Sequence, residues 1–314
     1  MLKRMSLKKI IVCLIALFSL GILYLLPNQK LETKNEVEYV SENKSTEIIY
    51  VESKHNYLSR VSINVENAEI STKAKELLED LIIDNKESKL PNGFKGVIPK
   101  NTKINSLEYK DNVIKVDFSS ELMNTKKDNE EKIIESIVYT LTSLPDVKYI
   151  IIYMDGEILT ELPQSKINLP TTLDRSFGIN KSYNITSDKN ITKTTIYYID
   201  NINNQDYYVP VTKINNDSRE KIEIIIEELS NNIPNNKLMS YLNNNTQLVS
   251  SNIDKDQINL VFNDYILDDT DSQEILDEVI YTICLSIQDN YYVNAVTFNI
   301  NDKEIHKTVL KSLE

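Results

Sequence analysis

Few side chains in this 314-residue chain have the type and spacing that chemistry requires. Cys13 lies in an apolar N-terminal segment and Cys284 in a later helical pattern, which gives no support to a disulfide framework or a Cys/His zinc site. His55 and His306 have no partner at the spacing of metal ligands, so we expect both to be solvated surface side chains. The sequence predicts neither a metal ion nor a cofactor.

The acidic clusters favour structural roles. Asp268 to Asp271 lacks the alternating acidic positions, central Gly and terminal Glu of an EF-hand loop. Asp271 to Glu274 instead matches a capping box at the start of a helix. Glu130 and Glu131 are likewise expected in the first turn of a helix, where carboxylates interact favourably with the helix dipole. Asp155-Gly156 is expected to form a tight hairpin turn in which Gly supplies a positive φ.

The remaining candidates do not form a catalytic group. No Ser stands in a Gly-x-Ser-x-Gly pattern, and no Ser has a plausible catalytic His within local reach, which gives no support to serine hydrolysis. Thr140 and Thr282 each follow a Tyr near a helix end, and backbone capping or an internal hydrogen bond is expected of both. The pairs Tyr207-Tyr208 and Tyr291-Tyr292 are candidates for ligand contacts, but strand tyrosines usually pack. No catalytic residue is predicted, and we expect the protein not to be an enzyme.

Composition and charge exclude further classes of protein. A hydrophobic fraction of 41% with 26% charged residues suits a chain that buries a core, so disorder and a multispanning membrane protein are excluded. The 35 Lys and Arg against 47 Asp and Glu give a net charge of -12, which makes nucleic acid an improbable partner. The chain has only five glycines, too few to suggest the glycine-rich loops of phosphate-binding and nucleotide-binding enzymes.

The N-terminal segment predicts a membrane anchor. Four cations precede an uncharged run from Ile10 to Leu26, which has the length of a short membrane span and no small-residue cleavage pattern after it. The cations place the N-terminus in the cytoplasm and the folded part outside. Lipidation of Cys13 is an alternative, although the residues before it form a poor lipobox. The residues assigned to topology are Lys3, Arg4, Lys8 and Lys9, and those assigned to the anchor are Ile10, Leu14, Leu17, Leu20 and Leu26.

The rest of the chain is predicted to be a tandem duplication. Residues 102–122 align with residues 246–266 at a constant offset of 144, and both stretches alternate apolar and polar residues as half-buried strands do. Two further matches flank this one: residues 137–141 with 279–283, and residues 48–51 with 196–199. The predicted parts are a stub and anchor (1–27), a tether (28–45), a first repeat (46–165), a linker (166–192), a second repeat (193–306) and a tail (307–314).

Each repeat is predicted to have the element order β-β-α-β-β-α-β. The second helix is expected near 129–144 or 272–287, and the last strand at 148–153 or 293–300. Asp217 to Glu220 has the pattern of a capping box for the first helix of the second repeat. Because each helix needs an apolar face covered, we expect an α+β fold in which a small mixed or antiparallel sheet is backed by two helices on one side.

Residues 77–162 resemble a GerMN domain. The residues that carry this resemblance are Gly96, Ile98, Pro99, Phe118, Thr140, Asp155 and Gly156. The second repeat keeps the apolar skeleton, but Met239 to Leu242 replaces the Gly-x-Ile-Pro turn and Asn301 to Lys303 replaces Asp155-Gly156. The resemblance implies a ring-building-motif-like fold and a protein of the sporulation and germination envelope of Firmicutes. Members of the family are typically lipoproteins, whereas this chain has no clear lipobox.

Two classes of function stay open. The resemblance implies partners among envelope and sporulation proteins, such as the channel complex between mother cell and forespore, and a homo-oligomer or ring. The leading hypothesis is a non-catalytic, membrane-anchored assembly or scaffold protein, because neither repeat carries a motif for chemistry. The alternative is an envelope binding module for a cell-wall glycan, a peptide or a small ligand. A ligand-binding module needs a concave site with converging polar and aromatic groups, whereas an assembly module presents flat faces.

Overall fold

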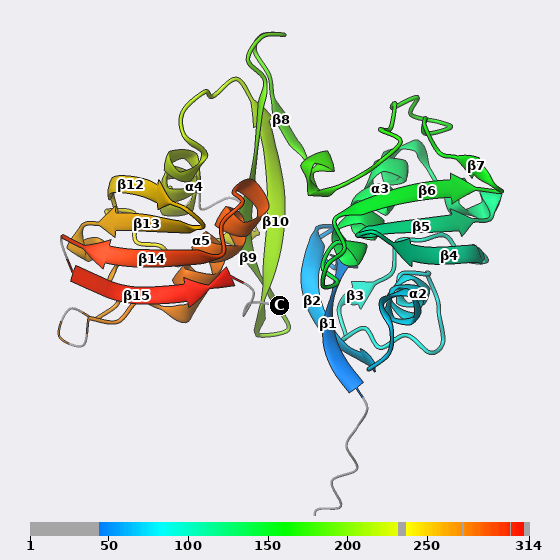
Figure 1. Ribbon diagram of the computed structural model, residues 1–314, viewed down its shortest axis with the longest axis horizontal. Coiled ribbons are helices and arrows are strands. Elements are labelled where there is room, and N and C mark those ends of the chain that lie inside the picture. Colours follow the sequence, from blue (N-terminus) through cyan, green and yellow to red (C-terminus); the bar gives the residue numbers. More distant parts are fainter. Residues whose placement is uncertain (1–43, 232–236, 270, 272, 302, 311–314) are drawn as a thin grey trace, which may run out of the picture. The chain divides into compact units, whose positions relative to one another are not determined.

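The computed structural model in Figure 1 describes residues 44–231, 237–269, 271, 273–301 and 303–310. The topology residues Lys3 to Lys9, the anchor from Ile10 to Leu26 and Cys13 lie outside the described residues. Among the helices that are described, none is long and apolar enough to cross a membrane. The anchor therefore stays a prediction from the sequence.

The described elements form two similar series. The first consists of β1 (Lys44–Ser53), β2 (Leu58–Glu66), α2 (Ile70–Asp80), β3 (Phe94–Lys95), β4 (Ile104–Lys110), β5 (Val113–Phe118), η1 (Ser120–Met123), α3 (Lys127–Leu141), β6 (Tyr149–Met154) and β7 (Glu157–Ile158). Between the series lie η2 (Arg175–Phe177) and β8 (Ser182–Asn184). The second consists of β9 (Thr192–Ile202), β10 (Gln205–Asn215), α4 (Lys221–Ser230), β11 (Leu238–Met239), β12 (Leu248–Asp254), β13 (Gln257–Phe262), η3 (Asp264–Ile266), α5 (Asp277–Asn290), β14 (Ala295–Ile300) and β15 (Lys303–Val309).

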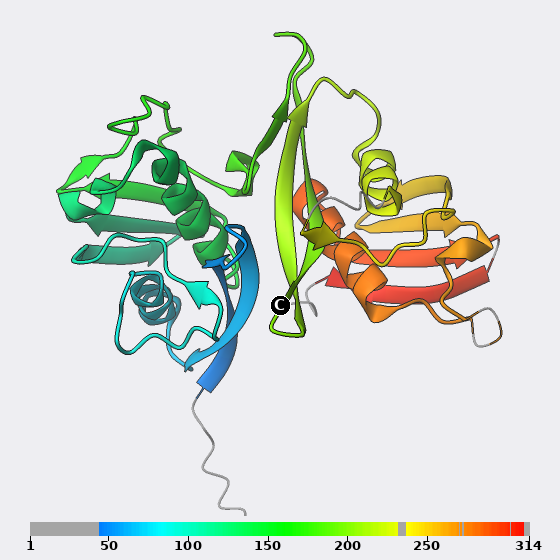
Figure 2. The ribbon, with the colours of Figure 1, turned by 180° about the vertical axis from the view of Figure 1, so that it is seen from behind.

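The predicted α+β class is confirmed, but the expected single sheet in each repeat is wrong. Each repeat has its own four-stranded sheet, β4-β5-β6-β7 or β12-β13-β14-β15, with one parallel pair at its centre. The opening hairpins lie apart from these sheets and combine into a third sheet, in the order β11-β9-β10-β2-β1-β3 with β8 beside β10. Figures 1 and 2 show α3 between the β1-β2 hairpin and the four-stranded sheet of the first repeat.

This placement explains why the helix and hairpin are apolar on more than one face. Residues Ile133 to Leu141 of α3 are all buried, as expected for a helix with sheets on two sides. Residues 47–51 of β1 are buried in an unbroken run rather than in alternation. A strand covered on both faces loses the period-two pattern, so its sequence does not reveal which sheet it joins.

The structure corrects the alignment of the two repeats. The offset of 144 holds for β4-β5 and β12-β13. In the hairpins and helices, however, Thr140 accepts the backbone N–H of Tyr50 and Ser286 accepts that of Tyr197, both at 2.9 Å. Tyr50 therefore corresponds to Tyr197 and not to Tyr198, and Thr140 corresponds to Ser286 and not to Thr282. The helix match was displaced by one turn, because an apolar helix pattern nearly repeats after four residues.

Both predicted capping boxes are wrong. Helix α5 begins at Asp277, because Asp269 and Glu274 pair as an isolated bridge that holds the preceding residues outside the helix. The N–H of Asp271 donates to the Asp269 carboxylate at 2.8 Å within this turn. Helix α4 begins at Lys221, and Asp217 accepts the N–H of Arg219 at 3.1 Å ahead of the first turn.

The chain contains additional strands after each predicted last strand. β7 pairs with β6, and β15 pairs with β14 as far as Val309, which lies beyond the expected end of the second repeat at residue 306. The predicted turn at Asp155-Gly156 is confirmed, since both residues have positive φ, +50° and +83°, and join β6 to β7 as a two-residue hairpin. Asp117 accepts the Gly156 N–H at 3.0 Å, which fixes the turn against β5.

The Gly-x-Ile-Pro segment of the first repeat holds the end of α2. The N–H of Ile98 donates to the Leu81 carbonyl at 2.8 Å, and the Thr102 hydroxyl donates to the Pro99 carbonyl at 2.7 Å. A Cβ on Gly96 would lie 2.2 Å from the Leu81 carbonyl oxygen, so only glycine fits. The motif residues here are structural.

We expect Gly96→Ala to lower the free energy of unfolding by about 3 kcal/mol, because its Cβ would collide with backbone atoms that cannot move without breaking the contact with Ile98. Gly156→Ala is the matched control. It has open space around the new Cβ but a positive φ, so about 1 kcal/mol is expected. Urea unfolding of both variants measures the difference, and equal losses would contradict the steric argument.

Candidate functional site

An ion pair with a buried carboxylate joins the two repeats. Arg175, in η2, donates to the Asp289 carboxylate of α5 at 2.6 Å; the Asp289 side chain is 1% exposed and the Arg175 side chain 25%. The same guanidinium donates to the hydroxyls of Thr142 at 3.2 Å and Ser143 at 2.7 Å, both at the end of α3. It also lies 4.9 Å from the ring centroid of Tyr139. One side chain therefore connects the second helix of the first repeat with its counterpart in the second.

Corresponding tyrosines meet beside this ion pair. The hydroxyls of Tyr50 and Tyr197 lie 2.9 Å apart, and Tyr197 also donates to Asp289 at 3.0 Å. Burial, reinforced by the Asp289 carboxylate, raises the pKa of Tyr139 and Tyr197 well above the ordinary value. Burial lowers the pKa of Arg175, but Asp289 and the surrounding hydroxyls outweigh this effect and raise it. The phenols of Tyr139 and Tyr197 therefore stay neutral beside the ion pair.

A second polar group crosses the junction three residues further along β1 and β9. His55 Nδ1 lies 2.7 Å from the buried Asp200 carboxylate, and the Ser53 hydroxyl donates to the same carboxylate at 3.4 Å. The expectation that His55 is a solvated surface residue is wrong, because its partner lies far away in the sequence. His306 is half-buried as well, with its ring 5.9 Å from that of Phe298.

These contacts have an approximate two-fold relation. Tyr50 and Ser53 correspond in the duplication to Tyr197 and Asp200, and each residue contacts its own counterpart. Contacts between equivalent residues are the mark of an isologous interface, which here occurs within one chain. The hairpins also pair with each other at the junction, with Arg60 of β2 opposite Tyr208 of β10.

Asn180 completes the pairing of these two hairpins. Pro210 has no N–H to donate to β2, and the ladder is limited to the single pair beside it. The Asn180 side chain accepts the Leu58 N–H at 2.9 Å and donates to the carbonyls of Leu58 at 2.8 Å and Pro210 at 2.7 Å. Asn180 and Arg175 both lie in the segment that the sequence predicted as a linker.

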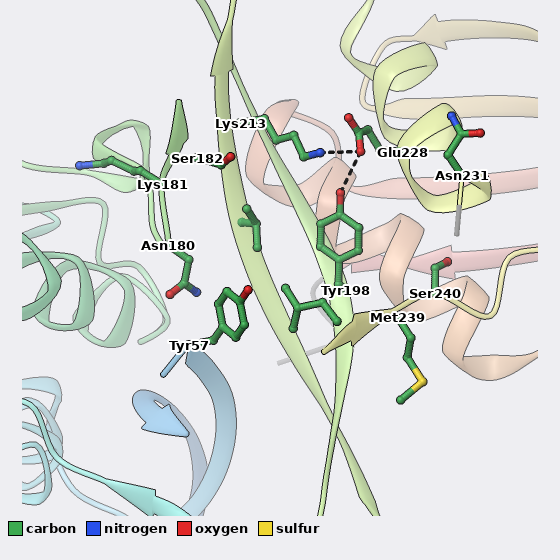
Figure 3. A pocket seen from close by; sticks show the side chains of 12 residues that line it. Tyr57, Asn180, Lys181, Ser182, Tyr198, Lys213, Glu228, Asn231, Met239 and Ser240 are labelled. Atoms are coloured by element: carbon green, nitrogen blue, oxygen red, sulfur yellow. Dashed lines mark hydrogen bonds and ion pairs between the residues drawn. The ribbon is translucent and has the colours of Figure 1, made fainter. Parts of the chain in front are cut away.

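A small cavity opens next to Asn180. It has a volume of about 280 Å³, with Tyr57 and Lys181 on one side and Tyr198 and Met239 on the other. Figure 3 shows Glu228 at its wall, where the carboxylate accepts from Lys213 at 2.5 Å and from the Tyr198 hydroxyl at 3.3 Å. The polar groups of this wall therefore bond to one another.

The remaining residues singled out in the sequence lie apart from one another and make separate local contacts. Glu130 is buried in the first turn of α3 and accepts the N–H groups of Gln164 and Ser165. Thr282 donates to the Glu278 carbonyl at 2.9 Å. Burial raises the pKa of the Cys284 thiol to about 12, which makes it an inert core residue.

The tyrosine pairs mostly serve packing, as expected. Tyr207 packs edge-on against Phe94, and Tyr208 stacks on Tyr281. The Tyr291 hydroxyl accepts the Ile222 N–H at 2.9 Å, whereas Tyr292 is fully exposed. Within the described ranges, no three His, Cys, Asp or Glu side chains are grouped so that they could hold a metal ion.

Comparisons with known proteins agree with this architecture. The family model "Germane: Sporulation and spore germination" matches residues 27–160 and 195–306. The chain belongs to the Germane family. It is 31% identical over 262 residues to the spore germination protein GerM of Bacillus subtilis (strain 168), which covers 81% of this chain and 71% of GerM. The solved tandem GerMN domains of the sporulation protein GerM from Bacillus subtilis superpose with a TM-score of 0.74 at 28% identity, over 83% of this chain and 92% of that one.

The GerMN resemblance is thereby confirmed, and the two repeats are tandem GerMN domains. In this Germane-family chain the junction also contains a carboxyl group, that of Glu135, whose pKa lies near neutral pH. The Lys181 ammonium lies 2.6 Å from Glu131 and 3.5 Å from Glu135, and the N–H of Asn180 donates to Glu135 at 2.9 Å. Burial raises the pKa of Glu135 to about 7, in spite of the opposing effect of Lys181.

We expect removal of one partner of the junction pair to destabilise the fold strongly. Arg175→Met leaves the buried Asp289 carboxylate without its cation, so a loss of about 3 to 5 kcal/mol in the free energy of unfolding is expected. The double variant with Asp289→Leu should recover much of this loss, because it removes the uncompensated charge. Arg219→Met, which breaks exposed ion pairs with Asp217 and Glu227, is the control and should not shift the urea midpoint. Equal effects of the two arginine variants would show that the junction pair is not buried in solution.

Glu135 predicts a pH dependence of stability. A folded-state pKa near 7, above the ordinary 4.5, means that the folded protein holds this proton more tightly than the unfolded chain. The stabilisation is complete below pH 4.5 and is lost as the pH rises through 7. Glu135→Gln stays neutral, so its stability relative to the parent should increase between these limits. Urea titrations across the interval measure this difference, and a difference that does not vary with pH would contradict the assignment.

Proposed function

We propose that this Germane-family protein is a non-catalytic assembly factor of the sporulation and germination envelope, which contacts other proteins through an open sheet edge. The observation that carries the proposal is strand β12. It pairs only with β13 among the described strands, and its other side faces no strand of the described chain. Val249 and Ile253 on this strand are 66% and 49% exposed.

Charge distinguishes β12 from the other long sheet edges. The edge strand β4 of the first repeat carries Glu108 and Lys110, and β15 carries Lys303, Glu304 and Lys307. Strand β12 has a single charged residue, Asp254, at its end. Charged side chains on an edge oppose pairing with another chain, whereas an uncharged edge with exposed β-branched residues favours it. A strand of a partner protein added to β12 would pair its backbone groups and cover both apolar side chains.

The junction supports this role mechanically. The residues from Lys44 onward form one compact unit, in which Arg175, Tyr197 and Asn180 fix one repeat to the other. A rigid tandem pair loses less conformational freedom on assembly than two repeats on a flexible linker would. We further propose that the N-terminal segment anchors this unit to the cell membrane with the folded part outside the cytoplasm, in the space between mother cell and forespore during sporulation.

The role of the β12 edge is tested by introducing charged residues of the kind that β4 and β15 carry. Val249→Lys and Ile253→Lys should each reduce cross-linking of the chain to its envelope partner in sporulating cells at least tenfold, since a buried unpaired lysine opposes strand addition. Tyr265→Lys, at an equally exposed position of η3, is the matched control and should leave the cross-link intact. Normal partner capture by both edge variants, with the fold retained by circular dichroism, would contradict the proposal.

A further inference from the structure

A wide cleft crosses the junction on the side where α3 and α5 end. It has a volume of about 610 Å³ and lies above the Arg175–Asp289 pair. Lys148 and Tyr149 of the first repeat contribute to one wall, and Gln288 and Tyr292 of the second repeat contribute to the other. Lys193 at the start of β9 and Lys221 at the start of α4 complete the lining. The cleft exists only because the junction holds the two repeats together.

The cleft is cationic in an acidic protein. Its charged lining residues are Lys148, Arg175, Lys193 and Lys221 against Asp174 and Asp289. Since Arg175 and Asp289 neutralise each other, three lysines face one carboxylate, in a chain whose net charge is -12. Lys148, Lys193 and Lys221 form no ion pair with the described residues, although 47 acidic residues are available in the sequence.

Burial destabilises the charge of two of these lysines. It is the main cause that lowers the pKa of Lys193, and Lys181 adds to the effect, while the Glu131 and Asp174 carboxylates oppose it without cancelling it. Burial alone lowers the pKa of Lys221. An anion bound between them would remove this penalty, since an opposite charge at close range favours the charged form.

The other lining groups favour a saccharide over a peptide. Tyr149 and Tyr292 are 42% and 106% exposed at the two walls, and aromatic faces of this kind stack on the apolar face of a sugar ring. At the cleft, the Asn290 side chain accepts the N–H of Thr195 in β9 at 3.2 Å and donates to its carbonyl at 2.6 Å, and Ile150 of β6 pairs with Leu173, so these backbone groups are not free to pair with a peptide. Gln288 is positioned to hydrogen-bond ring hydroxyls or amides.

We propose that this cleft binds an acidic glycan, a chain of saccharide rings that carry carboxylate or phosphate groups. The lysines hold the acidic groups, and Tyr149 and Tyr292 hold the rings. This site is separate from strand β12, so it does not rest on the assembly role proposed above.

The test is calorimetric titration of the full chain with three probes of similar length. The first is an oligosaccharide of alternating N-acetylglucosamine and N-acetylmuramic acid, which carries carboxylates; the second is a neutral N-acetylglucosamine oligomer; the third is oligoglutamate. We expect the acidic saccharide to bind most tightly and its affinity to fall with added salt. Substitution of one lysine by Ala should weaken binding about three- to fivefold, and substitution of Lys148, Lys193 and Lys221 together about 30- to 100-fold. Tyr292→Ala should weaken binding of the acidic saccharide and not that of oligoglutamate.

The control is the triple variant Lys103→Ala, Lys110→Ala and Lys115→Ala, which removes the same number of charges from exposed positions in β4, in β5 and just before β4. Its affinity for the acidic saccharide should stay within about twofold of that of the parent, because the three substituted lysines are far from the cleft and salt screens their charge. Tighter binding of oligoglutamate, equal binding of the neutral oligomer, or an equal loss in the control variant would overturn the proposal. Val249→Lys should bind the saccharide normally, so a failure of the edge leaves this result interpretable.

Discussion

The buried pair of Arg175 and Asp289 is the interaction on which the arrangement of the two repeats depends. A guanidinium and a carboxylate withdrawn from water are costly unless every donor and acceptor finds a partner, and here Thr142, Ser143 and Tyr197 supply the remaining ones. Such a network tolerates little displacement of one repeat against the other, because a small shift leaves a charge unpaired. Geometry rather than net stabilisation is therefore what the pair contributes, as is common for buried ion pairs that fix a unique arrangement.

Duplication explains why this network could form. Two copies of one folded unit that meet through equivalent surfaces place each residue near its own counterpart, as Tyr50 and Tyr197 show. Identical groups at such an axis make only neutral contacts, and divergence is needed for a charge pair. Asp200 occupies the position that Ser53 has in the first repeat, and His55 lies within hydrogen-bond distance of its carboxylate. The residues that complete the junction, Arg175 and Asn180, come from the segment between the repeats, which has no counterpart to constrain it.

The sequence was sufficient where the physics is local and insufficient where it is not. Alternating strands, the Asp155-Gly156 turn and the offset of 144 in the β4-β5 hairpin all follow from periods of two residues and from turn geometry. The hairpin β1-β2 is buried on both faces, so its pattern did not show that it belongs to a separate sheet. Helix α5 was placed too early because the Asp269–Glu274 bridge competes with the capping pattern. The junction was missed since Arg175 and Asp289 lie 114 residues apart, and neither has a local signature.

The difference between the repeats also bears on the kind of assembly. If β4 and β12 were equally open, each chain would offer two equivalent edges, and strand addition at both would lead to an open polymer. The charges Glu108 and Lys110 oppose pairing at β4, whereas β12 carries only Asp254, at its end. In the proposed assembly role, strand addition at β12 alone would give each chain a single directed contact. The cationic cleft lies instead at the junction and uses residues of both repeats, so it requires the duplication itself. If the two repeats have different roles, the second repeat must keep its core packing while its surface is free to diverge. This agrees with a second repeat that lacks the family turn residues but retains its apolar core.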